Sequence, residues 1–449
     1  MKVGNKSNFL GTKKITDLLF NQSYPAVIGL LVLSLYNLVD TIFIGHGVGS
    51  LGIAGLTISF PLQMIFIAFS QALGLGAASI ISRALGSNQI KKAEQALLNC
   101  FSLILISSFA ITGLVMVFME PLLKLFGSTP EILPYAMEYM NIIILSTVFI
   151  VFISALLHVI RAQGHAKFAM VAMIVGIGIN IILDPIFIFW FDMGIGGAAL
   201  ATVIGHIVAS LLVLYYFVSK KSLIKVRLEK FVFDWKIVKE IFSIGSSSFA
   251  RLVSANIIFI VVNNSLALYG GVIAIAAFGI VNRVIMMILM PVFGIVQGMQ
   301  PIVGYNFGSK KYKRVKEVIS LGIKVTTGLC ILAFIILYGF ADFIAGVFTT
   351  ETELVEMTIP ALRIIVLMLP IIGYQVVAAG VYQSMGKAKS AFFISILRQV
   401  VILIPLLLIL PMFFQLQGIW YAFPIADLLS GIVIAYILYL ENKKLRKMI

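Results

Sequence analysis

The sequence predicts an all-α membrane protein in which twelve transmembrane helices form two six-helix bundles. Its composition, its series of long apolar runs and its internal repeat lead to this prediction. Of the 449 residues, 61% are hydrophobic and 11% are charged, whereas soluble domains carry about 25% charged residues. The mean hydropathy of +1.09 also indicates a chain that lies largely within a bilayer.

The apolar runs predict twelve spans, because each can supply the roughly 20 residues that a helix needs to cross a bilayer. Their centres lie near residues 30, 67, 106, 146, 178, 206, 251, 288, 328, 368, 400 and 429. The residues before the first span lack the apolar core and cleavage site of a signal peptide, so we expect that span to be retained.

Basic residues alternate between the loops. Every second loop is basic, as at Lys91-Lys92, at residues 310–316 and at residues 443–447, whereas the opposite loops hold only Lys124. Cytoplasmic loops carry an excess of Lys and Arg. We therefore expect both termini in the cytoplasm and the chain in the plasma (inner) membrane of a bacterium or archaeon.

An internal repeat relates the two halves. Gly86-Ser87 recurs as Gly308-Ser309, an offset of 222 residues between 86 and 308, and the same offset takes Gly49 to Gly271 and Gly164 to Gly386. One offset across several loops predicts a duplicated six-helix unit, and an even number of spans gives both copies the same orientation. We predict an N-terminal lobe over residues 1–218, a cytoplasmic linker over 219–239 and a C-terminal lobe over 240–449.

Polar side chains interrupt two spans of the first half. Tyr36 and Asp40 are four residues apart in the first span, and Asn180 and Asp184 are four apart in the fifth, so each pair shares a helix face. An ionisable group at membrane depth costs about 2.5 to 3.5 kcal/mol on insertion scales and normally faces a bundle interior or a wet cavity. The repeat offset replaces both acids by apolar residues in the second half.

These residues predict a site for a coupling cation. Burial disfavours the charged form of a carboxyl group, and a second carboxylate disfavours it further, so Asp40 and Asp184 can take up a proton near neutral pH. With the neutral oxygens of Asn180 and Thr202, the same residues form a possible Na⁺ site. Both ions remain open, as does a purely structural hydrogen bond between helices.

Other chemistry is not indicated. The four histidines are scattered, Cys100 and Cys330 form no pair or metal-ligand pattern, and no phosphate-binding Gly-Lys-Ser/Thr loop occurs. We therefore expect no enzyme activity and no cofactor. The net charge of +15 is spread over the loops, which argues against nucleic acid as a partner.

Flexible and aromatic side chains near the span centres suggest a substrate cavity, although such a stripe is also typical of packing. These candidates are Phe60, Met64, Met173, Asn263, Met286, Met287, Met290 and Arg283. Arg283 is expected either to line the cavity or to pair with Asp427. Near their span ends, Arg251, Arg363 and Arg398 are expected to extend to the membrane interface.

Four motifs together resemble the multidrug and toxic compound extrusion (MATE) transporters. They are Val39-Asp40-Thr-Ile-Phe-Ile-Gly45, Arg83-Ala-Leu-Gly86, Arg161-Ala-Gln-Gly164 and Asn180-Ile-Ile-Leu-Asp184-Pro185. The resemblance covers the whole chain. It implies two lobes around a V-shaped cavity, alternating access, and export of organic cations in exchange for H⁺ or Na⁺.

The pattern of the DinF-like branch matches at six positions, and the motif in the fifth span also resembles the MepA-like transporters. The six positions are Pro25, Tyr36, Asp40, Asn180, Asp184 and Thr202. The branch resemblance implies a cation site in the N-terminal lobe and a bend of the first helix at Pro25.

We therefore expect a secondary active multidrug efflux antiporter whose partners are small organic cations and membrane lipid, and which acts as a monomer. A flippase for lipid-linked precursors is the alternative. Its cavity should be cationic in order to meet phosphates, and Arg283 keeps this alternative open.

Overall fold

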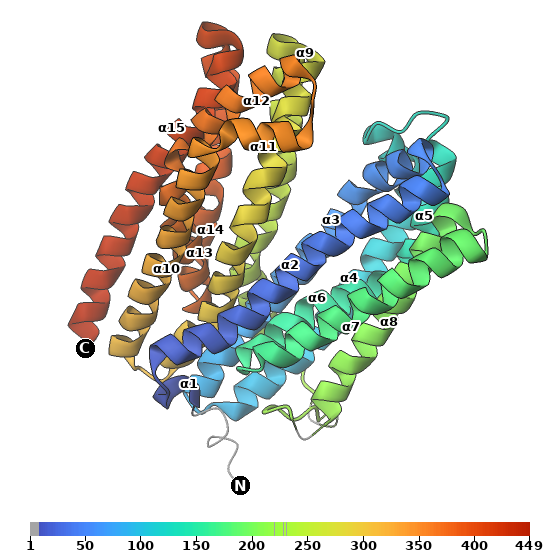
Figure 1. Cartoon of the computed structure of the whole chain (residues 1–449). Coiled ribbons are helices and arrows are strands. Elements are labelled where there is room, and N and C mark those ends of the chain that lie inside the picture. Colours follow the sequence, from blue (N-terminus) through green and yellow to red (C-terminus); the bar gives the residue numbers. More distant parts are fainter. Residues whose placement is uncertain (1–8, 220, 228, 230) are drawn as a thin grey trace.

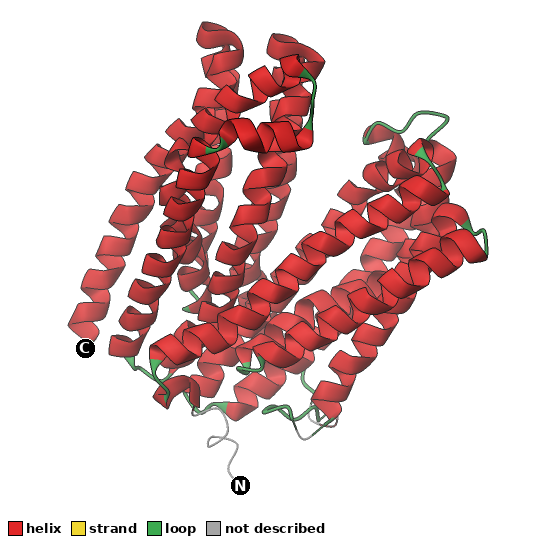
Figure 2. Ribbon diagram, viewed as in Figure 1, coloured by secondary structure: helices red, strands yellow, loops and turns green. Residues whose placement is uncertain are grey.

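The computed structural model describes residues 9–219, 221–227, 229 and 231–449. Parts of the predicted N-terminal lobe and linker, at residues 1–8, 220, 228 and 230, lie outside the described residues. The regular structure in the described part is helical, with short connecting loops (Figure 2). The predicted fold class is confirmed.

The first half contains six long helical passes. They follow the short helix α1 (Phe9–Thr12). The passes are α2 (Ile15–Gly47), α3 (Ser50–Gly86), α4 (Ile90–Leu125), α5 (Leu133–Ile143) with α6 (Thr147–Ala162), α7 (Ala166–Pro185) and α8 (Gly194–Val218). A 3-10 turn, Ile144–Ser146, joins α5 to α6, and a π-helical segment, Ile186–Trp190, extends α7.

The second half has the same order of passes. Its helices are α9 (Trp235–Gly308), α10 (Tyr312–Gly339), α11 (Ala341–Phe348), α12 (Thr352–Ile365), α13 (Leu369–Ser384), α14 (Ala388–Ile396) and α15 (Ile404–Met448). A 3-10 turn, Val366–Met368, joins α12 to α13, and a π-helical segment, Leu397–Leu403, joins α14 to α15.

Ten helical segments of the described chain are long and apolar enough to cross a membrane. Two of them are pairs of passes joined end to end. The 74-residue α9 breaks at Gly271, where φ is 67°, and α15 breaks at Gln415, where φ is 49°. With these two breaks, the ten segments provide the twelve predicted passes.

The backbone repeats at the offset found in the sequence. Gly49 and Gly271 both have positive φ, 86° and 67°, a region that is readily open only to glycine. Gly164 and Gly386 match in the same way, at 86° and 75°. The duplication is therefore structural as well as sequential.

The two lobes meet at one end and diverge toward the other (Figure 1). We call these the closed end and the open end. At the closed end α3 packs against the first part of α9, and Gly76 faces the backbone of Ile241 so closely that a Cβ there would collide with it. One buried hydrophobic cluster includes residues of both lobes, such as Leu73 and Ile241.

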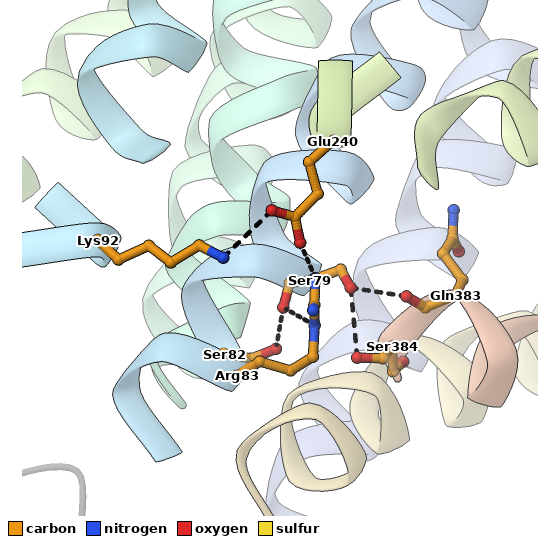
Figure 3. Close-up of polar contacts among 7 residues, drawn as sticks. All are labelled: Ser79, Ser82, Arg83, Lys92, Glu240, Gln383 and Ser384. Atoms are coloured by element: carbon orange, nitrogen blue, oxygen red, sulfur yellow. Dashed lines mark hydrogen bonds and ion pairs between the residues drawn. The ribbon is translucent and has the colours of Figure 1, made fainter. Parts of the chain in front are cut away.

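Polar contacts reinforce the closed end (Figure 3). The Glu240 carboxylate of α9 pairs with Arg83 at 2.9 Å and with Lys92 at 3.2 Å. The Ser79 hydroxyl of α3 donates to the backbone carbonyl of Gln383 at 2.6 Å. These contacts tie the N-terminal lobe to two different helices of the C-terminal lobe.

Helix α9 begins within the predicted linker, which was expected to extend to residue 239. Asp234 caps the helix, because its side chain accepts a hydrogen bond from the backbone nitrogen of Lys236 at 2.8 Å. Residues 235–239 of the predicted linker therefore form the first turn of α9.

Candidate cation site and central cavity

The candidate cation site lies inside the N-terminal lobe, where α2, α7 and α8 meet. Asp40 on α2 is 6% exposed, and Asp184 on α7 is fully buried. Their carboxyl groups lie within electrostatic reach of each other. The structure thus brings together two acids that are far apart in the sequence.

Neutral polar groups complete the cluster. The amide nitrogen of Asn180 donates to Asp184 at 3.3 Å and to the Thr202 hydroxyl at 3.0 Å. The Tyr36 hydroxyl lies 3.5 Å from the same Thr202 oxygen, a long distance for a hydrogen bond. Spacing along one helix explains the Asn180–Asp184 contact, whereas the contact with Thr202 requires α7 to pack on α8.

Three oxygens of this cluster are buried without a hydrogen-bond partner in the described structure. They are Oδ1 of Asp40, Oδ1 of Asn180 and Oδ2 of Asp184. No Lys, Arg or His of the described chain forms an ion pair with either carboxylate. An unpaired buried acceptor costs about 1 to 3 kcal/mol, and more when it is charged, so a proton or cation bound among these oxygens would stabilise the cluster.

The oxygen set suits either predicted ion. Two carboxylates, an amide oxygen and a hydroxyl are ligands for a hard cation such as Na⁺, and two adjacent carboxyl groups can share a proton. A site for a softer metal is not indicated, because the described residues contain no group of three or more His, Cys, Asp and Glu.

Sequence reasoning missed two members of this site, Tyr139 on α5 and Gln63 on α3. Tyr139 is 3% exposed, and its hydroxyl lies within electrostatic reach of Asp40, Gln63 and Thr202. A single tyrosine or glutamine in an apolar run carries little signal, since tyrosine occurs 15 times in the chain. Only the packing of α5 against α8 and α3 places them beside the acids.

Pro25 lies inside α2, and the helix continues through it from Ile15 to Gly47. This part of α2 contacts the other lobe: the Ser23 hydroxyl donates to the carbonyl of Ile295 at 3.3 Å. Helix α2 therefore joins the candidate cation site to the junction between the lobes.

A cavity of about 510 Å³ lies between the lobes, within the usual range for small-molecule sites. Its walls come mainly from α9, with contributions from α2 and α11, and include Ser34, Phe259, Arg283, Met286, Met287 and Phe348. Arg283, Met286 and Met287 were predicted to line such a cavity.

The other five predicted cavity residues lie away from these walls. Phe60 is 51% exposed elsewhere on α3, and the methyl group of Met173 packs against Gly29 of α2. Met64, Asn263 and Met290 are partly buried and are not among the residues around this cavity.

One expectation for the second lobe was wrong. Arg398 does not extend to the membrane interface but forms an ion pair with Asp427, whose side chain is 2% exposed. Arg398 lies in the π-helical segment Leu397–Leu403, a widened turn that redirects side chains and that the sequence pattern did not indicate. Arg283 therefore lines the cavity instead of pairing with Asp427.

Twelve passes in two repeated lobes around a shared cavity define a multi-pass membrane transporter. Residues 25–186 and 248–409 each match the MatE family, one match in each lobe. The chain belongs to the MatE family.

Known relatives match nearly the whole chain. The multidrug export protein MepA of Staphylococcus aureus (strain MRSA252) is 30% identical over 433 residues, which are 94% of this chain and 93% of that protein. The outward-facing structure of a multidrug resistance MATE family transporter of the MOP superfamily has a TM-score of 0.92 at 26% identity, covering 98% of this chain and 99% of the other.

A Pyrococcus furiosus transporter of the MOP superfamily is equally similar in fold. Its TM-score is 0.92 at 26% identity, and the match covers 98% of both chains. It is described as having a binding pocket of reverse polarity that suggests a different function. Pocket charge can thus differ between proteins that share this fold.

Proposed function

We propose that the chain is a secondary active multidrug efflux antiporter that exports organic cations in exchange for H⁺ or Na⁺. One observation carries the proposal: the three unpartnered oxygens of Asp40, Asn180 and Asp184 lie together in the buried interior of one lobe. A cluster that has more hydrogen-bond acceptors than donors, and no basic partner, is suited to take up a cation reversibly.

Helix α2 supplies a physical link between cation binding and transport. Ser34 lines the cavity, and Asp40 follows it by less than two turns of the same helix. Uptake of a proton or Na⁺ reduces the negative charge of the Asp40–Asp184 pair and hence the repulsion between α2 and α7, which changes how the two helices pack. A shift of α2 then alters the cavity wall, so cation and substrate favour different positions of this helix.

The gradients available are large enough for this task. One pH unit corresponds to about 1.4 kcal/mol per proton, and 100 mV adds about 2.3 kcal/mol per charge moved. Exchange of one or two protons or Na⁺ ions can therefore drive uphill export of a lipophilic cation.

We propose that the closed end faces the cytoplasm of a bacterium or archaeon. Basic residues gather there, in the α9–α10 loop and in the first turns of α4 and α10, as the positive-inside rule requires of the cytoplasmic side. They are Lys91, Lys92, Lys310, Lys311 and Lys313. The open end then faces outward, and the structure represents the state that releases drug and receives the coupling ion.

The multidrug specificity is proposed from the cavity and from the relatives. Met286 and Met287 are flexible and are 43% and 56% exposed, so they can adapt to apolar surfaces of different shapes. The relative MepA is a multidrug export protein, which supports the same conclusion.

A flippase for lipid-linked precursors is the second candidate, because of one observation. Arg283 is the only charged side chain among the described residues that line the cavity. A single arginine can bind a phosphate, whereas it repels an organic cation. The substrate experiment must therefore include both kinds of ligand.

The test is efflux of a fluorescent organic cation from proteoliposomes under an imposed proton or Na⁺ gradient. We expect the wild-type protein to accelerate efflux under one of the two gradients, and Asp40→Asn to abolish the acceleration. Asp342→Asn is the matched control, because Asp342 pairs with Arg363 in an exposed contact. No gradient-driven efflux, together with binding of a pyrophosphate lipid, would replace the antiporter by the flippase.

A further inference from the structure

A second, smaller cavity lies at the closed end, between the lobes. Its volume of about 20 Å³ exceeds the roughly 10 to 15 Å³ that one water molecule needs, which leaves room for a small ion but not for a phosphate group. Its walls come from α3 and α6 of one lobe and from α9 and α13 of the other, and they include Ser79, Ser82, Gln383 and Ser384, which Figure 3 shows.

Arg161 of α6 lines this cavity and has an unusual environment. Its side chain is 6% exposed, and its Nε has no hydrogen-bond partner. No ion pair or hydrogen bond within the described ranges involves its guanidinium group. A buried charge is normally paired, because removal from water disfavours an isolated ion, so an anion beside Nε would stabilise this arginine.

The surroundings add positive charge. Arg251 and Arg161 both lie within electrostatic reach of His158, which lines the same cavity. The nearby acid Glu240 is occupied by Arg83 and Lys92. The described side chains around the cavity therefore supply cations without a free carboxylate.

The internal repeat shows that the fold does not require a charge here. The offset of 222 residues takes Arg161 to Gln383, and Gln383 is fully paired. Its amide nitrogen donates to Ser248 at 2.8 Å, and its oxygen accepts from Gln300 at 3.0 Å. A neutral, satisfied side chain fills the equivalent position, so helix packing alone does not explain Arg161.

We propose that the cavity at Arg161 binds a monovalent anion of about the size of chloride. Two groups remain free to hold it. The Arg161 Nε–H is one, and the other is the amide of Gln297, whose Oε1 is buried without a partner. A half-turn of that amide exchanges its nitrogen and oxygen and directs an N–H donor into the cavity.

Anion binding is linked to the position of the lobes, because both lobes form the walls. The ion loses its site when the closed end opens, so it stabilises the state in which that end is closed. The inference does not depend on which substrate the protein exports or on the ion that drives export.

The first experiment uses bromide as an anomalous scatterer in crystals of the full chain. We expect a peak beside Arg161 in the wild-type protein and none in Arg161→Gln, which copies the residue of the second lobe. Density for water alone in the wild-type protein, at a bromide concentration of about 0.2 M, would overturn the proposal.

The second experiment measures thermal unfolding of the purified protein as chloride replaces gluconate at constant ionic strength. Occupation of a site present only in the folded state should raise Tm by about 2 °C in the wild-type protein. Arg161→Gln should lose the shift, and Arg161→Lys should retain part of it. The control Arg363→Gln removes an exposed arginine and should keep the full shift; an equal shift in Arg161→Gln would contradict the site.

Discussion

The two lobes share a fold, but the buried carboxylate of the C-terminal lobe has a basic partner and those of the N-terminal lobe have none. In the C-terminal lobe Asp427 forms an ion pair with Arg398, and its backbone carbonyl accepts from the Gln375 amide at 2.9 Å. In the N-terminal lobe Asp40 and Asp184 face each other without a basic partner, and each retains an unpaired oxygen. The first arrangement is balanced in charge, whereas the negative charge of the second falls only when a cation or proton binds.

This difference separates a structural charge from a functional one. The repeat offset takes Asp40 to Val262 and Asp184 to Leu406, so neither position requires an acid for packing. The ion pair of the C-terminal lobe can persist throughout a transport cycle. We therefore expect substitutions in the N-terminal lobe to affect coupling and those at the ion pair to affect stability.

The largest effect is expected for Asp184→Asn. The neutral amide cannot take up a proton or provide a charged ligand, so gradient-driven efflux should fall at least about tenfold. Thermal stability should stay unchanged or rise, because a costly buried charge is removed. Efflux from proteoliposomes and Tm of the purified protein provide the two measurements, and transport at the wild-type rate would contradict the assigned role.

The next effect is expected for Asp427→Asn, and it concerns stability. Removing one partner leaves Arg398 uncompensated, which costs several kcal/mol in a fully buried pair. The side chain of Arg398 is 29% exposed, so we expect a loss of about 2 kcal/mol. Denaturant unfolding in detergent measures it. The double variant Asp427→Asn with Arg398→Gln should recover part of the loss, and full additivity would argue against the pair.

A smaller effect is expected for Thr202→Val, and this variant distinguishes H⁺ from Na⁺ as the coupling ion. The substitution removes an oxygen that contacts Asn180 but leaves both carboxylates. Proton-driven efflux should therefore change less than about threefold. If Na⁺ drives transport, the apparent Na⁺ affinity should instead fall about tenfold, as expected for loss of one ligand. Efflux rates measured against pH and against Na⁺ concentration distinguish the two cases.

The smallest effect is expected for Tyr36→Phe. Its hydroxyl lies 3.5 Å from Thr202, so the substitution removes only a weak hydrogen bond. Efflux should stay within about twofold of wild type. A loss as large as that of Asp184→Asn would mean that the hydroxyl takes part in coupling.

The sequence alone determined the twelve passes and the duplication. Apolar runs of sufficient length can be recognised one segment at a time, because the bilayer requires each helix to satisfy its own backbone. The offset between the halves could be read from single glycines, and the positive φ angles of Gly49 and Gly271 show its physical basis. Spacing along one helix also placed Asn180 beside Asp184.

Contacts between helices were decided only by the tertiary structure. The junction of Tyr139 with Thr202, the pairing of Arg398 with Asp427 and the burial of Arg161 between the lobes all depend on how separate helices pack. Helical periodicity fixes the face on which a side chain lies, but it does not specify which other helix covers that face. A local widening of the helix, such as the π-helical segment at Leu397–Leu403, also changes the direction of side chains. The partners of buried charges could therefore be identified only in the folded structure.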